Sequence, residues 1–228
     1  LHKEYRRQRQ MCIRDRFSGH ALSDALQQIV QKETYDLEEI KSESDGVRLK
    51  YKGNLLKLIP EENEMGQILT AQINEEEKQT AFWDGESQSF IFNDKSFGSL
   101  KFDTYREKGT QYLIIYDGDM AWNFYKEDGA ARYVFVNQYG KPDEIQNAPA
   151  VFKGHERSLS GRGYIWGRTI PLLKKSLLWG SGPDTFTVKF PQTDYVMKVN
   201  TGLNMYQQLP TKAHSMYCLL YTSDAADD

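Results

Sequence analysis

The chain has 228 residues, with 29 Lys and Arg against 32 Asp and Glu, and a formal net charge of −3 at pH 7. This length suffices for one or two domains with a sizeable core, and the mild acidity argues against a nucleic-acid partner. The sequence contains no stretch that approaches the ~18–20 consecutive apolar residues of a transmembrane helix.

The two ends of the chain are compatible with one inverted nucleotide repeat read in opposite senses. The string RRQRQMCIRDR at Arg6–Arg16 can be back-translated to DNA whose reverse complement encodes the string that begins at Cys218. This inverted repeat resembles the transposon-type adapters of sequencing libraries, so we expect residues 1–16 and 218–228 not to be native and the chain to be a fragment. Residues 17–217 then carry 23 basic and 27 acidic residues and no cysteine, which excludes a disulfide framework or a thiolate metal site.

The first predicted element is an amphipathic helix at Ala21–Lys32. Its apolar residues follow i, i+4, i+8 spacing on one face: Ala21, Leu22, Ala25, Leu26, Ile29 and Val30. A polar, acidic linker is expected after it, through Ser42–Gly46.

From Val47 the hydrophobic period changes to two. VRLKY alternates, KGN forms a turn signal, and LLKLI follows, which predicts a β-hairpin. Asp-Gly pairs at Asp84, Asp117 and Asp128 lie between aromatic-rich strand candidates, and such pairs tolerate the positive φ of tight turns. The pattern predicts an antiparallel meander over about 45–137.

Beyond the meander, two prolines in residues 139–150 indicate a boundary between a β-rich part (17–150) and a second part (151–217). Helical spacing returns over Tyr164–Trp179, and Pro171 predicts either a kink or a helix that begins near Thr169. Pro191–Asn200 is expected to be a loop. The predicted fold class is α+β: mainly an antiparallel β meander, with an N-terminal amphipathic helix and a C-terminal helical segment.

Two arginines stand out in SGRGYIWGRTIPLLKK. Arg162 and Arg168, on one short segment with lysines and aromatic residues, could grip a phosphate through bidentate hydrogen bonds. Ordinary ion pairs at the surface or between domains are the alternative for both. His20, His155 and His214 show no metal-ligand spacing, so no metal site is predicted.

Taken together, SGRGYIWGRTIPLL, GSGPDTF, FPQTDY and KAHSMY, over about Ser160–Tyr217, resemble the large extracytoplasmic loop of Gram-positive O-antigen ligase/polymerase-like membrane glycosyltransferases. The resemblance implies an enzyme at the cell membrane that transfers a glycan from undecaprenyl diphosphate to a glycan, lipid or protein acceptor. It also implies that the parent is anchored by helices outside this chain, and that it needs no metal or other cofactor because arginines neutralise the diphosphate.

The resemblance also implies roles for three residues. Arg162 matches the arginine that binds the diphosphate and stabilises its leaving charge, Arg168 is a second candidate for the same role, and His214 matches the base that acts on the acceptor hydroxyl. Ser215 stands where the family usually has Asn, and the fragment is expected to be inactive alone.

A different class of function is also compatible with the sequence. The β-rich part could be a secreted or wall-associated module that binds glycan or protein without catalysis. On this hypothesis Trp83, Trp122 and Tyr125 would lie together on one exposed sheet face.

Overall fold

The computed structural model describes residues 32–64, 66–76, 78–92, 94–158, 162–176, 185–203, 205 and 210–211. They fall into two compact units, which we describe separately. The β-rich unit comprises residues 35–147 and 193–208, and the helical unit takes its described residues from 32–34, 148–192 and 210–211. His214 and all but the last residue of the predicted helix at Ala21–Lys32 lie outside the described residues.

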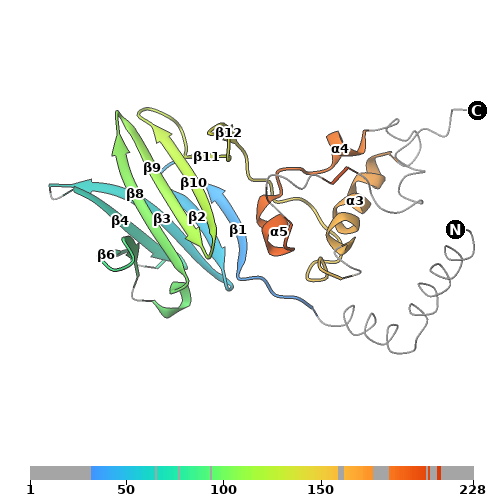
Figure 1. Ribbon diagram of the computed structural model, residues 1–228, viewed down its shortest axis with the longest axis horizontal. Helices are drawn as coiled ribbons and strands as arrows, with labels where there is room; N and C mark the ends of the chain where they lie inside the picture. The colour runs from blue at the N-terminus through green and yellow to red at the C-terminus, as the bar shows by residue number, and fades with distance from the viewer. Residues whose placement is uncertain are drawn as a thin grey trace, which may run out of the picture. The chain divides into compact units, whose positions relative to one another are not determined.

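The β-rich unit contains two antiparallel sheets in which each strand pairs with its neighbours in sequence (Figure 1). The first sheet has the order β1-β2-β3-β4-β5, formed by Leu37–Ser42, Val47–Tyr51, Asn54–Asn63, Gly66–Ile73 and Lys78–Thr80. The predicted hairpin is confirmed, since Tyr51 pairs with Asn54 across the turn.

The second sheet has the order β12-β11-β10-β9-β8-β7-β6. In chain order its strands are β6 (Phe82–Asp84), β7 (Ser89–Ile91), β8 (Leu100–Glu107), β9 (Thr110–Asp117), β10 (Met120–Glu127), β11 (Val134–Val136) and β12 (Pro142–Asp143), with the 3₁₀ turn η1 at Lys95–Phe97. The predicted antiparallel meander is therefore confirmed, and it is divided between two sheets.

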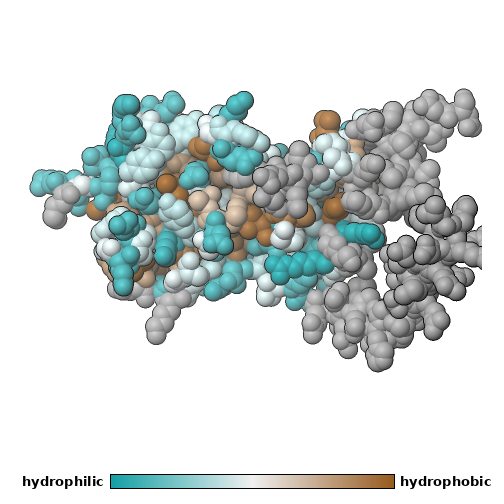
Figure 2. All heavy atoms as spheres, in the orientation of Figure 1, coloured by the Kyte–Doolittle hydropathy of each residue, from teal (hydrophilic) through white to brown (hydrophobic). Residues whose placement is uncertain are grey.

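Side chains alternate between the two faces of each strand, and those that face inward form the core of the β-rich unit. One hydrophobic cluster joins both sheets, with Leu49 and Leu58 from the first and Phe102, Leu113 and Trp122 from the second all at most 1% exposed. Outward positions carry polar and charged side chains, and Figure 2 shows hydrophilic side chains over much of the face of this unit that it displays.

Two parts of the β-rich unit differ from the sequence predictions. The expected linker contains strand β1, and a register shift between Leu37 and Glu39 breaks the period-two pattern that would have indicated it. The expected loop at Pro191–Asn200 contains helix α5 (Tyr195–Asn200), whose Tyr195 and Val196 are buried.

The helical unit contains α3 (Arg162–Ser176) and α4 (Phe186–Lys189). The prediction of a helix around Pro171 is confirmed, but the helix begins at Arg162 and not near Thr169. Tyr164 from α3 packs edge-on against Phe190, with ring centroids 5.9 Å apart, and both rings are at most 2% exposed.

Candidate functional site

Helix α3 presents two glycines and a proline to the preceding loop. Gly163, Gly167 and Pro171 are spaced four residues apart and so lie on one side of the helix. A Cβ at Gly167 would lie only 2.7 Å from the Val151 carbonyl oxygen, and one at Gly163 would overlap the His155 carbonyl oxygen. Glycine at both positions therefore lets the backbone of residues 151–156 lie directly on α3.

Pro171 completes this contact. A residue at position 171 would normally donate its backbone N–H to the carbonyl of Gly167, but proline has no N–H. The Gly167 carbonyl instead accepts a hydrogen bond from Val151 N at 3.0 Å. The proline inside the helix is thus compensated by the loop that packs on it.

The same loop occupies amide groups in the first turn of α3. Gly163 N donates to Ser158 O at 3.1 Å, and Tyr164 N donates to Glu156 O at 2.8 Å. The free amides of a helix N-terminus often bind anions, but here these two already have protein acceptors. An anion at this end of α3 would therefore depend chiefly on the Arg162 side chain.

Arg168 and Glu156 form a buried ion pair beneath this first turn. Arg168 Nη1 donates to Glu156 Oε1 at 3.3 Å, and both side chains are 3% exposed. Glu156 Oε2 also accepts a hydrogen bond from Gly154 N at 2.7 Å, and the Arg168 guanidinium lies 4.7 Å from the centroid of the Tyr164 ring. For Arg168 the geometry favours an ion pair over a phosphate contact, but the pair is buried within one unit and lies neither at the surface nor between domains.

Arg162 differs from Arg168 in its surroundings. It is the first residue of α3, its side chain is exposed, and it takes part in none of the ion pairs found among the described residues. The first turn of α3 contains no acidic residue, so a cation stands at the positive end of the helix dipole without compensation. This arrangement favours an anion beside Arg162.

Sequence reasoning did not find Glu156. It lies twelve residues before its partner, a spacing that predicts no contact, and nothing in its local sequence marks it as buried. The spacing of Gly163, Gly167 and Pro171 was visible in the sequence and could have indicated a helix face in backbone contact.

In the β-rich unit, α5 is fixed to the sheets by polar contacts. The Tyr195 hydroxyl donates to Asp143 Oδ2 at 2.6 Å, Asn200 Nδ2 donates to Leu37 O at 2.6 Å, and the Tyr195 ring lies 5.5 Å from that of Phe135. Lys198 of α5 is fully buried, and burial lowers the pKa of its ammonium group, with Asp194 acting in the opposite direction. Part of the segment that resembles the glycosyltransferase loop thus belongs structurally to the β-rich unit.

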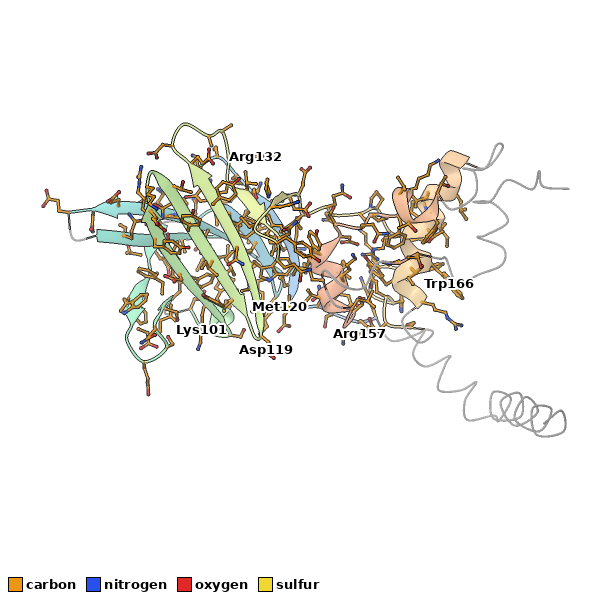
Figure 3. All side chains as sticks on the ribbon, turned by 45° about the horizontal axis from the view of Figure 1, so that its top comes forward. Lys101, Asp119, Met120, Arg132, Arg157 and Trp166 are labelled. Carbon is orange, nitrogen blue, oxygen red and sulfur yellow. The ribbon has the colours of Figure 1, made fainter. Side chains whose placement is uncertain are left out.

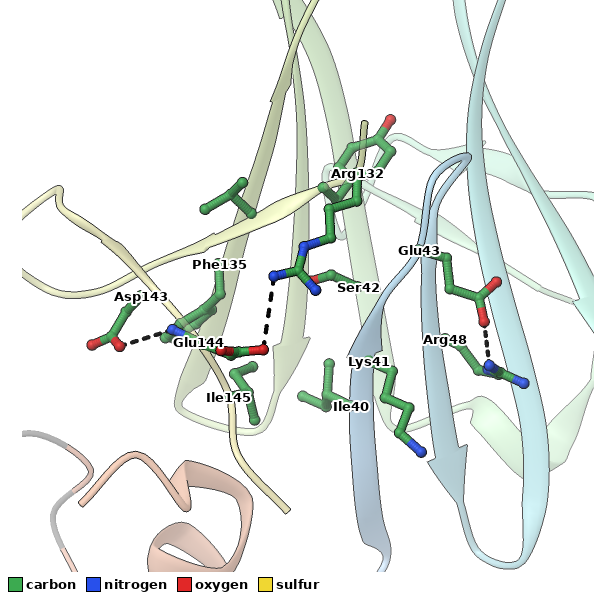
Figure 4. A pocket seen from close by; sticks show the side chains of 12 residues that line it. Ile40, Lys41, Ser42, Glu43, Arg48, Arg132, Phe135, Asp143, Glu144 and Ile145 are labelled. Carbon is green, nitrogen blue, oxygen red and sulfur yellow. Dashed lines mark hydrogen bonds and ion pairs between the residues drawn. The ribbon is translucent and has the colours of Figure 1, made fainter. Parts of the chain in front are cut away.

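A cavity of about 300 Å³ lies beside these contacts, between β1 and β11–β12 (Figure 4). Its apolar lining includes Ile40, Phe135 and Ile145. The cations at its rim have acidic partners: Arg132 lies 3.7 Å from Glu144, and Arg48 pairs with Glu43. These two arginines are therefore already paired and do not indicate an anionic ligand.

The predicted aromatic face of the binding-module hypothesis is wrong. Trp122 is fully buried, because it lies on the inward side of β10 in register with Ile115, whereas Tyr125 lies on the opposite side of the strand. Trp83 is 53% exposed at the edge strand β6. The outward Tyr125 instead continues a cross-strand row in which Tyr105 and Tyr112 stack on each other at 4.7 Å.

No protein-family model, curated protein or solved structure matches the chain. Within the described ranges, no helix is long and apolar enough to cross a membrane. Across the same residues, no three His, Cys, Asp or Glu side chains are grouped so that they could hold a metal ion.

Proposed function

We propose that residues 17–217 are part of the extracytoplasmic loop of an O-antigen ligase/polymerase-like glycosyltransferase, and that Arg162 binds the diphosphate of its undecaprenyl-linked glycan donor. The order of motifs over about Ser160–Tyr217 suggests the family. The observation that carries the role of Arg162 is its position: it is an exposed cation at the positive end of α3, with no acidic residue in the first turn.

A cation at this position lowers the stability of α3, and binding of an anion would explain why it is there. A cation near a helix N-terminus is unfavourable by about 0.3–1 kcal/mol, the amount by which an anion there is favourable. A diphosphate would reverse the sign of this interaction and would receive charge-assisted hydrogen bonds from the guanidinium. As glycan transfer proceeds, the leaving diphosphate gains negative charge, which Arg162 would stabilise.

Arg168 and His214, the other two residues that the resemblance singles out, are treated differently from each other. Arg168 already neutralises a buried carboxylate, so we assign it to the support of α3 and not to the donor. We keep the proposal that His214 is the base for the acceptor hydroxyl on the motif alone. The parent's acceptor glycan and its attachment to the cell membrane through helices beyond this chain are likewise proposals that rest on the resemblance.

The test is glycan transfer by the full-length protein expressed from its intact gene. Arg162→Gln should abolish transfer, because it removes the charge that binds the diphosphate. It should not lower the amount of protein, because it also removes an unfavourable cation from the positive end of the helix dipole. Arg157→Gln is the matched control, since Arg157 is an exposed arginine of the same unit (Figure 3) and should transfer normally. Normal transfer by Arg162→Gln would refute the assigned role.

The alternative of a non-catalytic binding module depended on an exposed aromatic sheet face, which the structure does not show. Trp83, Trp122 and Tyr125 do not share an exposed face, and the stacked pair of Tyr105 and Tyr112 already uses ring faces against each other. Stacked cross-strand tyrosines stabilise a sheet without any ligand. We therefore do not propose a glycan-binding platform on the β-rich unit.

A further inference from the structure

Glu156 holds together the start of α3 through three separate contacts. Its carboxylate bridges Gly154 N at 2.7 Å and Arg168 Nη1 at 3.3 Å, and its backbone carbonyl accepts the N–H of Tyr164 at 2.8 Å. The residue is 2% exposed, so all three contacts lie away from solvent. One buried residue thus connects the loop, the first turn and the second turn of the same helix.

The first turn of α3 depends on these contacts for the hydrogen bonds of two of its backbone amides. Its first turn offers no acidic side chain, and glycine at the second position gives little intrinsic helical preference. The loop carbonyls of Glu156 and Ser158 accept two of the N–H groups that an α-helix cannot pair internally at its N-terminus. Loss of the Glu156 carboxylate would release the loop from Arg168, so the acceptors of the Gly163 and Tyr164 amides would become mobile and the first turn would fray.

We propose that Glu156 is a positioning residue: it fixes the first turn of α3 and thereby directs the Arg162 side chain toward its anion. The link to diphosphate binding rests on the function proposed above, whereas the control of the first turn does not. A binding group must be held in place by its supporting contacts, and an arginine on a frayed turn would bind with lower affinity. Glu156 is buried and need not touch the ligand.

The experiment uses the full chain, inorganic pyrophosphate as the probe, and two readouts on each variant. The first is amide hydrogen exchange of Gly163 and Tyr164 measured by NMR. The second is the dissociation constant for pyrophosphate. Glu156→Gln should accelerate exchange of both amides at least about tenfold, since their acceptors become mobile, while amides of the β-rich unit exchange as in the wild type. It should also weaken pyrophosphate binding about fivefold or more.

Glu156→Asp provides a second variant if Glu156→Gln does not fold. It keeps the charge but shortens the reach to Arg168, so we expect an intermediate effect in both readouts. Unchanged exchange at Gly163 and Tyr164 in a folded Glu156 variant would overturn the proposal. Faster exchange with unchanged pyrophosphate affinity would also overturn it, because Arg162 would then bind independently of the first turn.

The two readouts separate this inference from the proposed function. If pyrophosphate binds the wild-type chain and Arg162→Gln binds equally well, the diphosphate role of Arg162 fails. The role of Glu156 in fixing the first turn is still decided by hydrogen exchange. If Arg162→Gln loses binding and Glu156→Gln does not, the proposed function stands and the positioning role fails.

Discussion

Glu156 and Arg168 lie against each other in the interior of the helical unit, with Oε1 3.3 Å from Nη1 and each side chain 3% exposed. A buried ion pair is weak evidence for net stability, because desolvation of the two charges opposes their attraction. Its effect appears when one partner is removed, since the other is then left as an uncompensated charge. A single substitution of Glu156 or Arg168 is therefore expected to destabilise α3, which contains Arg162.

We expect Arg168→Met to destabilise the helical unit by about 3–5 kcal/mol, and Glu156→Gln/Arg168→Met to recover a large part of this loss. Chemical denaturation followed by NMR signals of the helical unit measures both. Arg132→Met is the matched control, because Arg132 is 61% exposed and its partner Glu144 lies 3.7 Å away, so a change within about 1 kcal/mol is expected. Equal effects at Arg168 and Arg132 would contradict the role assigned to the buried pair.

Gly163→Ala and Gly167→Ala should both be destabilising, although alanine is intrinsically better than glycine in a helix by about 1 kcal/mol. The reversed sign follows because the new Cβ would meet the carbonyl oxygens of His155 and Val151. Thermal unfolding measures the effect. Gly85→Ala is the control, since nothing lies within 4 Å of its added Cβ and its φ is not positive. Stabilisation by either helix variant would show that the loop does not pack on α3.

The contact between Tyr195 and Asp143 predicts that α5 stabilises the β-rich unit. Tyr195→Phe removes the hydroxyl that donates to Asp143 Oδ2 at 2.6 Å, and should cost about 1–3 kcal/mol. Tyr139→Phe makes the same chemical change at a side chain that is 75% exposed, and should leave the free energy of unfolding unchanged. A Tyr195→Phe variant as stable as the wild type would remove this role for α5.

The raised pKa of Asp117 predicts that the free energy of unfolding of the β-rich unit depends on pH. Burial, and then the nearby Asp36 carboxylate, raise the pKa of Asp117, and Lys52 acts in the opposite direction. The native state therefore binds its proton more readily than the unfolded state, so the free energy of unfolding falls as pH rises through the interval between the two pKa values. Asp117→Asn should have a higher Tm than the wild type at pH 7.

This difference should disappear at a pH below about 3.9, the usual pKa of an aspartate, where Asp117 is protonated in both states. Asp119→Asn is the control, because Asp119 is exposed in the β9–β10 turn (Figure 3). A gain that persists at low pH, or one that Asp119→Asn reproduces, would assign the effect to net charge and not to burial of Asp117.

The meander was predictable because its strands alternate strictly, as Val47, Leu49 and Tyr51 do, and because tight turns separate them. β1 was not, since its register shift changes the spacing of Leu37 and Ile40. α5 was missed because its residues become buried only through tertiary contacts with β1 and β12. Trp122 was misplaced because the alternation alone does not state which side of β10 faces the other sheet.

At the candidate site, the sequence pointed to both arginines but did not indicate that Arg162 is exposed and Arg168 is buried. Once α3 is known to begin at Arg162, six residues of helix separate Arg162 from Arg168 by about 120° around the axis, so the two cannot share one face. Burial of Arg168 follows from that rotation and from the loop that carries Glu156. The role of Glu156 depends on a fold in which residues twelve apart meet, which local patterns do not encode.

The measurement that tests the central proposal most directly is the uninterrupted sequence of the genomic locus that encodes residues 17–217. The account predicts that the reading frame continues past both boundaries, that it does not encode residues 1–16 and 218–228, and that it runs into several apolar segments of about 18–20 residues on each side. A frame without apolar segments on either side, or one that contains both terminal strings, would contradict it.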